Sequence, residues 1–276
     1  MKNLFTRTLT GTIYVTVLIL GILTGPYVFA GLFAIIAALC LWEFYGLVNM
    51  HHRANVSRII NVCGGVYLFI ATFFWISTDL TFKVYLPYIS YILFTFIMEL
   101  YRKKANPLLD LAYSFLGQMY IALPIALLNW IVFYPTGIGG VEYTPSILVG
   151  LFVFIWANDT GAFLIGVSLG KHRLFERISP KKSWEGFFGG MTLAVSCSLI
   201  LSYLCPQIPL LHWVCLGVFI VILATFGDLT ESLMKRTLDV KDSGKALPGH
   251  GGFLDRFDSM LFAIYALAFY MEIVVR

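Results

Sequence analysis

Apolar runs of about twenty residues recur along the whole chain, and this feature limits the possible folds more than any other. A bilayer core about 30 Å thick is crossed by roughly 20 helical residues. Nine runs approach that length, and their predicted bounds are 9–24, 27–48, 59–77, 84–101, 111–134, 146–169, 186–205, 209–229 and 257–275. The alternating segments of a transmembrane β-barrel are absent from the sequence. The pattern therefore predicts an all-α polytopic membrane protein with about nine transmembrane helices.

The shortage of charge supports this class. Only 12% of the 276 residues are charged and 59% are hydrophobic, whereas about a quarter of the residues of a soluble domain are charged. This composition excludes most cytosolic enzymes, and we expect no nucleic-acid partner. The sequence contains no internal repeat, so we expect a single integral membrane domain over 1–276. Within it, 1–145 form the N-terminal spans and 146–276 hold the candidate catalytic spans and loops.

The basic residues divide unequally between the two sets of connecting segments that alternate along such a chain. Of the 19 lysines and arginines, all but Lys83 and Arg276 fall in one set. Because basic residues concentrate on the cytoplasmic side, we expect a cytoplasmic N-terminus, an external C-terminus and residence in the cell inner (cytoplasmic) membrane. The run 9–24 follows a basic start, as in a signal peptide, but 27–48 follows at once, which favours a retained helical hairpin.

A polar stripe begins at the inner end of the eighth predicted span. Asp228, Glu231, Ser232 and Lys235 are spaced i, i+3, i+4 and i+7, which places them on one helical face. A solvated helix end with an ion pair between Glu231 and Lys235 would explain part of the stripe. Asp228, however, lies at the apolar margin of the span, where a carboxylate is costly and usually functional.

The loop after this span mixes basic residues, glycines and carboxylates. Asp255 and Asp258 lie three residues apart at the start of the ninth span, so both can face one point. Helix capping is the ordinary role of such residues. It does not explain two carboxylates opposite Asp228, whereas an oxygen-ligand site for Mg²⁺ does. Gly251 and Gly252 would let the backbone approach a phosphate closely.

Further polar residues occur in and before the sixth and seventh spans. With Ser179 as the N-cap of a helix, Lys181 and Lys182 would fall in its first turn, where the helix dipole repels cations. Either a bound anion or the positive-inside rule explains them, and both interpretations stay open. Asp159 lies near the middle of the sixth span, where a buried carboxylate needs a partner. The glutamates near span ends, Glu43 among them, are explained by packing or snorkelling and receive no role.

The segment from Ser232 to Asp258 resembles a known signature. Its fixed positions, Ser232-x-Met234-Lys235-Arg236, Lys241-Asp242-x-Gly244 and Leu247-Pro248-x-His250-Gly251-Gly252-Phe253-x-Asp255-Arg256-Phe257-Asp258, are similar to those of the phosphatidate cytidylyltransferase, or CDP-diacylglycerol synthase, family. Segments 158–161, 179–186 and 227–232 resemble the same family. The likeness covers about residues 150–260, while the first 145 residues match only as generic spans.

The resemblance implies that CTP reacts with phosphatidic acid to give CDP-diacylglycerol and pyrophosphate. It implies Mg²⁺, allows a second ion such as K⁺, and suggests a homodimer in a lipid membrane. Two polyanions must meet, so positioning and charge neutralisation should dominate catalysis. The expected catalytic residues are Asp228, Asp255 and Asp258, which would bind the metal, together with Lys235 and Arg236. The residues expected to bind the substrates are Asp159, Lys181, Lys182, Ser232, Lys241, Asp242, His250, Gly251, Gly252 and Arg256.

Two other functions stay open at this point. An ion-coupled transporter would suit the intramembrane carboxylates Asp159 and Asp228, although the sequence lacks the internal repeats typical of transporters. A related CTP-dependent lipid kinase would keep the fold and change the reaction.

Overall fold

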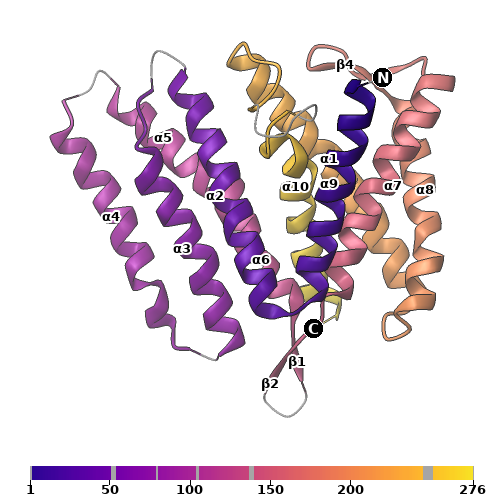
Figure 1. The fold of residues 1–276 in the computed structure, drawn as a ribbon, viewed down its shortest axis with the longest axis horizontal. Coiled ribbons are helices and arrows are strands. Elements are labelled where there is room, and N and C mark those ends of the chain that lie inside the picture. The colour runs from indigo at the N-terminus through magenta and orange to yellow at the C-terminus, as the bar shows by residue number, and fades with distance from the viewer. Residues whose placement is uncertain are drawn as a thin grey trace. The chain divides into compact units, whose positions relative to one another are not determined.

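The computed structural model describes residues 2–50, 54–78, 80–103, 106–136, 140–244 and 251–275. Helices dominate these residues (Figure 1). The α-helices are α1 (Lys2–Leu23), α2 (Pro26–Met50), α3 (Arg58–Ser77), α4 (Leu86–Tyr101), α5 (Pro107–Gly117), α6 (Leu123–Val132), α7 (Ser146–Leu169), α8 (Trp184–Leu204), α9 (Leu210–Thr237) and α10 (Leu254–Tyr270). The shorter elements are the 3-10 helix η1 (Phe82–Tyr85), the π-helical turns η2 (Gln118–Ala122) and η3 (Met271–Val275), and the hairpin strands β1 (Phe133–Thr136), β2 (Gly140–Tyr143), β3 (Arg173–Phe175) and β4 (Ser179–Ser183).

Seven helical segments are long and apolar enough to cross a membrane, which confirms an all-α polytopic membrane protein. They are Pro26–Met50, Arg58–Ser77, Phe82–Tyr101, Pro107–Val132, Ser146–Leu169, Trp184–Leu204 and Leu210–Thr237. The remaining two predicted spans coincide with shorter helical segments, Thr8–Leu23 of α1 and the 17-residue α10. That nine helices cross the membrane therefore stays a prediction.

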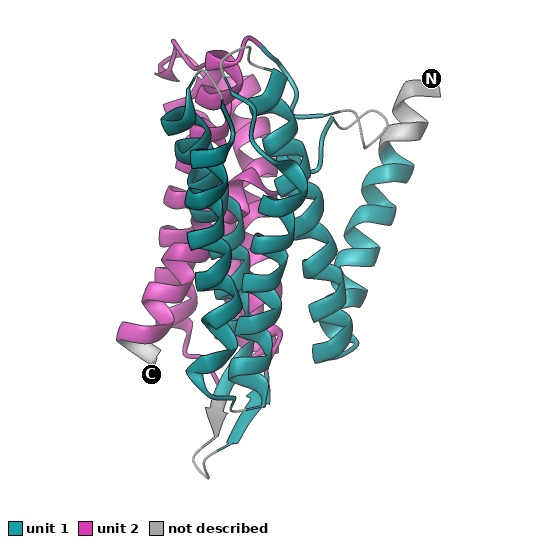
Figure 2. Cartoon of the chain, turned by 90° about the vertical axis from the view of Figure 1, so that its left-hand side faces the viewer, with its two compact units in different colours: residues 1–143, 240–256 teal, residues 144–239, 257–276 magenta. Residues whose placement is uncertain are grey.

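The chain forms two compact units, which Figure 2 distinguishes by colour. Unit 1 comprises residues 1–143 and 240–256, and unit 2 comprises residues 144–239 and 257–276. The first division falls beside the boundary predicted near residue 145. The segment 240–256 belongs with the N-terminal helices, an assignment that no sequence pattern indicates. That the whole chain is one integral membrane domain stays a prediction.

Unit 1 contains a buried polar network at the π-helical turn η2. Gln118 donates hydrogen bonds to the hydroxyl of Tyr45 at 3.1 Å and to the carbonyl of Asn61 at 2.8 Å. The hydroxyl of Tyr45 donates in turn to the carbonyl of Ser114 at 2.7 Å. Water cannot satisfy polar groups inside a bilayer, so this network keeps a helical irregularity compatible with membrane depth. It ties together α2, α3, α5 and η2.

In unit 2, glycines bring α7 and α8 into backbone contact. A Cβ atom at Gly161 would lie 2.7 Å from the carbonyl oxygen of Gly189 and 2.9 Å from the Cα of Gly190. A Cβ atom at Gly190 would lie 2.6 Å from the carbonyl oxygen of Asn158. Small residues permit this close approach, which stabilises helix pairs in lipid through van der Waals contact. Helices α7 and α8 are therefore tightly packed against each other in unit 2.

The start of α8 corrects one prediction. Lys181 and Lys182 do not lie in a first helical turn after Ser179, because residues 179–183 form strand β4, which pairs with β3. The N-cap is Ser183, whose hydroxyl accepts a hydrogen bond from Gly186 N at 3.1 Å. Pairing in the hairpin keeps both lysines outside the helix, so the positive end of the helix dipole does not oppose two cations in its first turn.

Adding one methyl group between α7 and α8 should destabilise the protein. We expect Gly161→Ala to lower the stability by about 1–3 kcal/mol, the usual cost of overpacking a close contact. Gly31→Ala in α2 is the control, because a Cβ atom there meets no atom within 4 Å. Thermal unfolding of both variants in the same detergent provides the measurement. Equal midpoints for the two variants would contradict the close packing of α7 and α8.

Candidate active site

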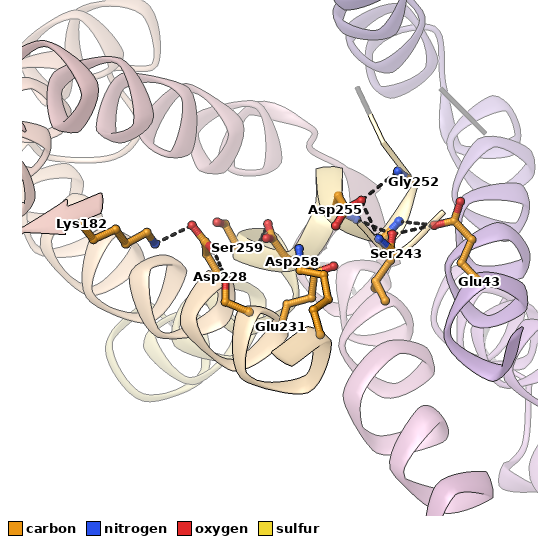
Figure 3. A network of polar contacts seen from close by, with 12 residues as sticks. Glu43, Lys182, Asp228, Glu231, Ser243, Gly252, Asp255, Asp258 and Ser259 are labelled. Carbon is orange, nitrogen blue, oxygen red and sulfur yellow. Dashed lines mark hydrogen bonds and ion pairs between the residues drawn. The ribbon is translucent and has the colours of Figure 1, made fainter. Parts of the chain in front are cut away.

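Three carboxylates lie side by side in unit 2 (Figure 3). Asp228 and Glu231 come from α9, and Asp258 comes from α10. A Cβ atom at Gly227 would lie 2.6 Å from the carbonyl oxygen of Asp258, so the backbones of the two helices touch at this position. The charge of Asp258 interacts with those of both Asp228 and Glu231. This contact thus sets a cluster of acidic side chains at the start of α10.

Two lysines pair with this carboxylate cluster, defined as Asp228, Glu231 and Asp258. The ammonium group of Lys182 lies 2.5 Å from Oδ2 of Asp228, and that of Lys235 lies 2.7 Å from Oε2 of Glu231. Three carboxylates and two ammonium groups, when ionised, leave one excess negative charge among these five side chains. The cluster is therefore suited to attract a further cation.

The predicted stripe on α9 is confirmed in its geometry and corrected in its environment. Ser232 donates a hydrogen bond to Oδ1 of Asp228 at 3.2 Å, and Lys235 pairs with Glu231 as expected. The latter pair is not a solvated helix end, because Glu231 is only 1% exposed. Oε1 of Glu231 is buried without a hydrogen-bond partner among the described residues. Sequence reasoning assigned Glu231 no site role, because the spacing of residues on a helix does not reveal burial by neighbouring helices.

A cavity of about 230 Å³ adjoins Asp228 in unit 2. Its polar lining consists of Asn158 and Asp159 from α7, Lys181, Lys182 and Ser183 from the β4 segment, and Thr225 and Asp228 from α9. Phe163 and Phe187 add apolar walls. The structure thus brings four of the predicted residues, Asp159, Lys181, Lys182 and Asp228, to one cavity. Cations, carboxylates and apolar walls in one cavity suit an anionic ligand with a lipid portion.

Two neighbouring residues of α7 differ from expectation. The side chain of Asp159 is exposed and lines the cavity, so it is not buried in the helix bundle as expected. Asn158, one residue earlier, is the buried one: it is 7% exposed, and its Oδ1 has no hydrogen-bond partner in the described part of the chain. The sequence could not distinguish the two, because neighbouring helical residues point in directions about 100° apart.

A second polar network lies in unit 1, at the end of the 240–256 segment (Figure 3). Oδ2 of Asp255 accepts hydrogen bonds from the backbone N–H groups of Ser243 at 2.9 Å and Gly252 at 2.8 Å. Oε2 of Glu43 accepts from the hydroxyl of Ser243 at 3.0 Å and from Leu254 N at 2.9 Å. Asp255 therefore binds backbone N–H groups of the loop and of the residues just before α10. This agrees with helix capping, the ordinary role of such a residue.

The other predicted site residues divide between the units. Asp242, Gly251, Gly252, Asp255, Arg256 and Lys241 belong to unit 1, whereas Ser232, Lys235 and Arg236 belong to unit 2. Gly251 has φ +81°, a left-handed conformation that explains glycine at this position. Lys241, Asp242, Arg236 and Arg256 are exposed. His250 lies outside the described residues.

The donor groups of unit 2 fit a magnesium ion that shares its coordination with a substrate. Among the described residues, no three His, Cys, Asp or Glu side chains are arranged to hold a metal ion by themselves. Mg²⁺ does not require such a cage, because it is usually bound by one or two carboxylates, water and substrate phosphates. Asp228 and Asp258 supply two carboxylates, and Glu231 adds a third, buried carboxyl group next to Asp258.

Comparison with known proteins gives the class of the chain. The profile of the cytidylyltransferase family matches residues 5–274, so the chain belongs to that family. It is 32% identical over 265 residues to a phosphatidate cytidylyltransferase of Staphylococcus aureus (strain COL). These aligned residues cover 94% of this chain and 95% of that protein. It is 42% identical over 133 residues to the phosphatidate cytidylyltransferase of Bacillus subtilis (strain 168), covering 48% of this chain and 49% of that protein.

These comparisons confirm the predicted family and show that the likeness covers more of the chain than its motifs indicate. The likeness that the motifs placed at about 150–260 continues through almost the whole chain. The first 145 residues are therefore more than generic spans. Apolar spans carry few of the polar motifs by which a resemblance is noticed in a single sequence, which explains why this part was missed.

Proposed function

We propose that the carboxylate cluster and the adjoining cavity of unit 2 form the catalytic centre of this transferase. The chain acts as a phosphatidate cytidylyltransferase: it transfers the cytidylyl group of CTP to phosphatidic acid and forms CDP-diacylglycerol and pyrophosphate in phospholipid biosynthesis. The observation that carries the assignment of the site is the Lys182–Asp228 pair, 2.5 Å apart on the cavity wall. A group that binds phosphate and a group that binds metal thus occupy one place.

The chemistry requires charge neutralisation more than a strong base. The phosphate of phosphatidic acid attacks the α-phosphorus of CTP, a new P–O bond forms, and the bond to the β-phosphate breaks to release pyrophosphate. A phosphomonoester is already ionised near neutral pH, because its second pKa is about 6. Catalysis therefore rests on holding two polyanions in line and stabilising the charge of the leaving group. Lys182 and Lys181 on the cavity wall are placed for this task.

The metal assignment is part of the proposal. Asp228 and Asp258 would hold Mg²⁺, with Asp255 as the third predicted ligand and K⁺ as the proposed second ion. When bound, Mg²⁺ supplies positive charge to the phosphate oxygens and to the leaving pyrophosphate. Lys235 and Arg236 complete the proposed catalytic set, and Lys235 acts by holding Glu231 at 2.7 Å. The remaining proposed substrate contacts are Asp159, Ser232, Lys241, Asp242, His250, Gly251, Gly252 and Arg256.

The orientation in the membrane follows from the same site. We propose nine spans in the cell inner membrane, with the N-terminus and the catalytic centre on the cytoplasmic side and the C-terminus outside. The concentration of lysines and arginines in one set of connecting segments supports this arrangement. CTP would arrive from the cytoplasm, and phosphatidic acid would enter from the inner leaflet. A homodimer without a nucleic-acid partner completes the proposal.

Purified protein in detergent should convert CTP and phosphatidic acid when Mg²⁺ is present. We expect labelled CDP-diacylglycerol and pyrophosphate in equal amounts, and no product after chelation of the metal. A CTP-dependent lipid kinase would instead yield CDP and a phosphorylated lipid, and an ion-coupled transporter would yield neither pair. Diacylglycerol in place of phosphatidic acid serves as the control substrate. Absence of CDP-diacylglycerol under conditions in which a relative is active would contradict the function.

Asp255→Asn should separate a metal-binding role from the loop contacts of this residue. Asparagine keeps one side-chain oxygen as acceptor for Ser243 N and Gly252 N, so folding should be preserved. We expect turnover to fall by about 100-fold or more, in the range seen when a charge-stabilising group is lost. Asp239→Asn is the matched control, because Asp239 is exposed and its φ of 52° suits asparagine. Full activity of Asp255→Asn would remove this residue from the metal site.

Cysteine labelling should report the orientation. In a variant whose five cysteines are replaced, Lys83→Cys should react with an impermeant maleimide in intact cells. Arg177→Cys, in the exposed hairpin between β3 and β4, should react only after the membrane is opened. Both residues are exposed, so access to reagent and not burial decides the outcome. The reverse labelling pattern would contradict the cytoplasmic assignment.

A further inference from the structure

The hairpin of β3 and β4 in unit 2 carries both cavity lysines, but it has little internal structure to hold it in place. Its strands have two pairs of directly opposed residues, with an irregularity between them. Most of residues 171–182 are exposed. A two-stranded hairpin with so little buried surface is only marginally stable by itself. Contacts with the rest of unit 2 must therefore fix the positions of Lys181 and Lys182.

Glu185, in the first turn of α8, binds the residues that lead into this hairpin. Its carboxylate accepts hydrogen bonds from the backbone N–H of Lys171 at 3.1 Å and from that of His172 at 3.2 Å. Nδ1 of the His172 ring lies 2.6 Å from Oε1 of the same carboxylate. The N–H of Trp184 donates to the carbonyl of His172 at 2.9 Å. These contacts tie the residues before β3 to the start of α8, which follows β4.

The ordinary roles of a glutamate at a helix start do not account for these contacts. A carboxylate in a first turn is favoured by the positive end of the helix dipole without any contact to other segments. The carboxylate of Glu185 instead binds backbone N–H groups outside its own helix. Snorkelling to water does not explain it either, because this side chain is only 25% exposed. The contacts of Glu185 therefore serve to fix the hairpin.

The fixed hairpin places Lys182 at the cavity. Lys182 lies three residues before Glu185, and its ammonium group pairs with Asp228 (Figure 3). Between them, Ser183 is buried and caps α8 through its bond with Gly186 N. Without the Glu185 contacts, the pair of Lys182 and Asp228 would have to hold the hairpin on the cavity wall. Partly exposed ion pairs contribute too little for this task.

We propose that Glu185 is a positioning residue of the transferase reaction. By binding the backbone of residues 171–172, it holds the hairpin in the conformation that presents Lys182 to a substrate phosphate. The inference rests on the proposed function, because it needs Lys182 to contact that phosphate. Glu185 does not belong to the described lining of the cavity, so its effect must pass through the hairpin.

A loosened hairpin should lower activity only through its lysines. If the hairpin is competent in one molecule in ten, the apparent affinity for the substrate falls about tenfold. Once Lys182 has been removed, loss of Glu185 should add little, because residues that act through one contact have non-additive effects. A merely structural glutamate would behave otherwise. Its loss would lower the amount of folded enzyme, and that effect would multiply with the loss of Lys182.

The test is a double-mutant cycle of Glu185→Ala and Lys182→Ala, with kcat/KM for CTP measured at subsaturating phosphatidic acid. We expect kcat/KM to fall about tenfold in Glu185→Ala and about 100-fold in Lys182→Ala. The double variant should lose less than about threefold beyond Lys182→Ala. Glu185→Gln should stay within about threefold of the wild type, because its amide oxygen can still accept from backbone N–H groups.

Glu176→Ala is the matched control for this cycle. It removes an exposed carboxylate from the same hairpin, so kcat/KM should not change. A loss of about 1000-fold in the double variant would show that the two residues act independently and would overturn the proposal. Wild-type kcat/KM in Glu185→Ala, or an equal loss in Glu176→Ala, would also overturn it.

Limited trypsin digestion without substrate tests the hold on the hairpin apart from the reaction. We expect faster cleavage after Arg177 and Lys181 in Glu185→Ala than in the wild type and Glu176→Ala. If Glu185→Ala does not accumulate, Glu185→Asp takes its place. It keeps the charge in the first turn of α8, but its side chain is one methylene shorter, so it should show the faster cleavage and the loss of kcat/KM. Wild-type cleavage in the variant that accumulates would overturn the proposal.

The two hypotheses fail in different ways. Full activity of Lys182→Ala would contradict the proposed function of the site, and it would overturn the positioning role with it. An impaired Lys182→Ala together with a fully active Glu185→Ala would overturn the positioning role alone.

Discussion

The cost of placing charge among apolar helices governs this structure. A carboxylate within a span is unfavourable unless another group compensates it. The structure meets this constraint in three ways: Lys182 approaches Asp228 from a hairpin, Lys235 approaches Glu231 from the next helical turn, and backbone N–H groups with a hydroxyl approach Glu43. The contacts of Lys182 with Asp228 and of Glu43 with Ser243 and Leu254 each fix a separate segment relative to a helix of its own unit. The polar groups thus fix the positions of segments at the ends of otherwise apolar helices, and the residues of the candidate site lie on these segments.

Glycine is the second requirement, because polar groups reach one another only where backbones come close. Gly227 lets α9 touch α10 beside Asp258, and Gly252 makes room for the carboxylate of Glu43. A β-carbon at either position would enter space that a carbonyl or carboxylate oxygen occupies. Interiors pack too densely to absorb such an atom without a shift of the backbone. Gly252 of the signature is therefore explained by approach of protein to protein, in addition to any approach to phosphate.

Local periodicity and chemistry could be predicted from the sequence, but contacts between distant segments could not. The apolar runs correspond closely to the helices, and the i, i+3, i+4, i+7 stripe from Asp228 to Lys235 forms as predicted, because both depend on the helical repeat alone. Ser179 and Ser183 are equally good caps by composition, and pairing of β3 with β4 decides between them. Glu43 looked like a packing residue because its partners lie far away in the sequence. Its contacts form because the chain folds back on itself, which no local sequence pattern indicates.

The two ion pairs of unit 2 differ in the free energy that is needed to separate their partners. The side chains of Lys182 and Asp228 are 29% and 35% exposed, and such partly exposed pairs contribute only about 0–1 kcal/mol. Those of Lys235 and Glu231 are 14% and 1% exposed, and removing one partner of a buried pair costs about 3–5 kcal/mol. The pair of Lys182 and Asp228 can therefore be exchanged for other partners at little cost. Lys235 is held too firmly for such an exchange, so its contribution is to hold the side chain of Glu231 in place.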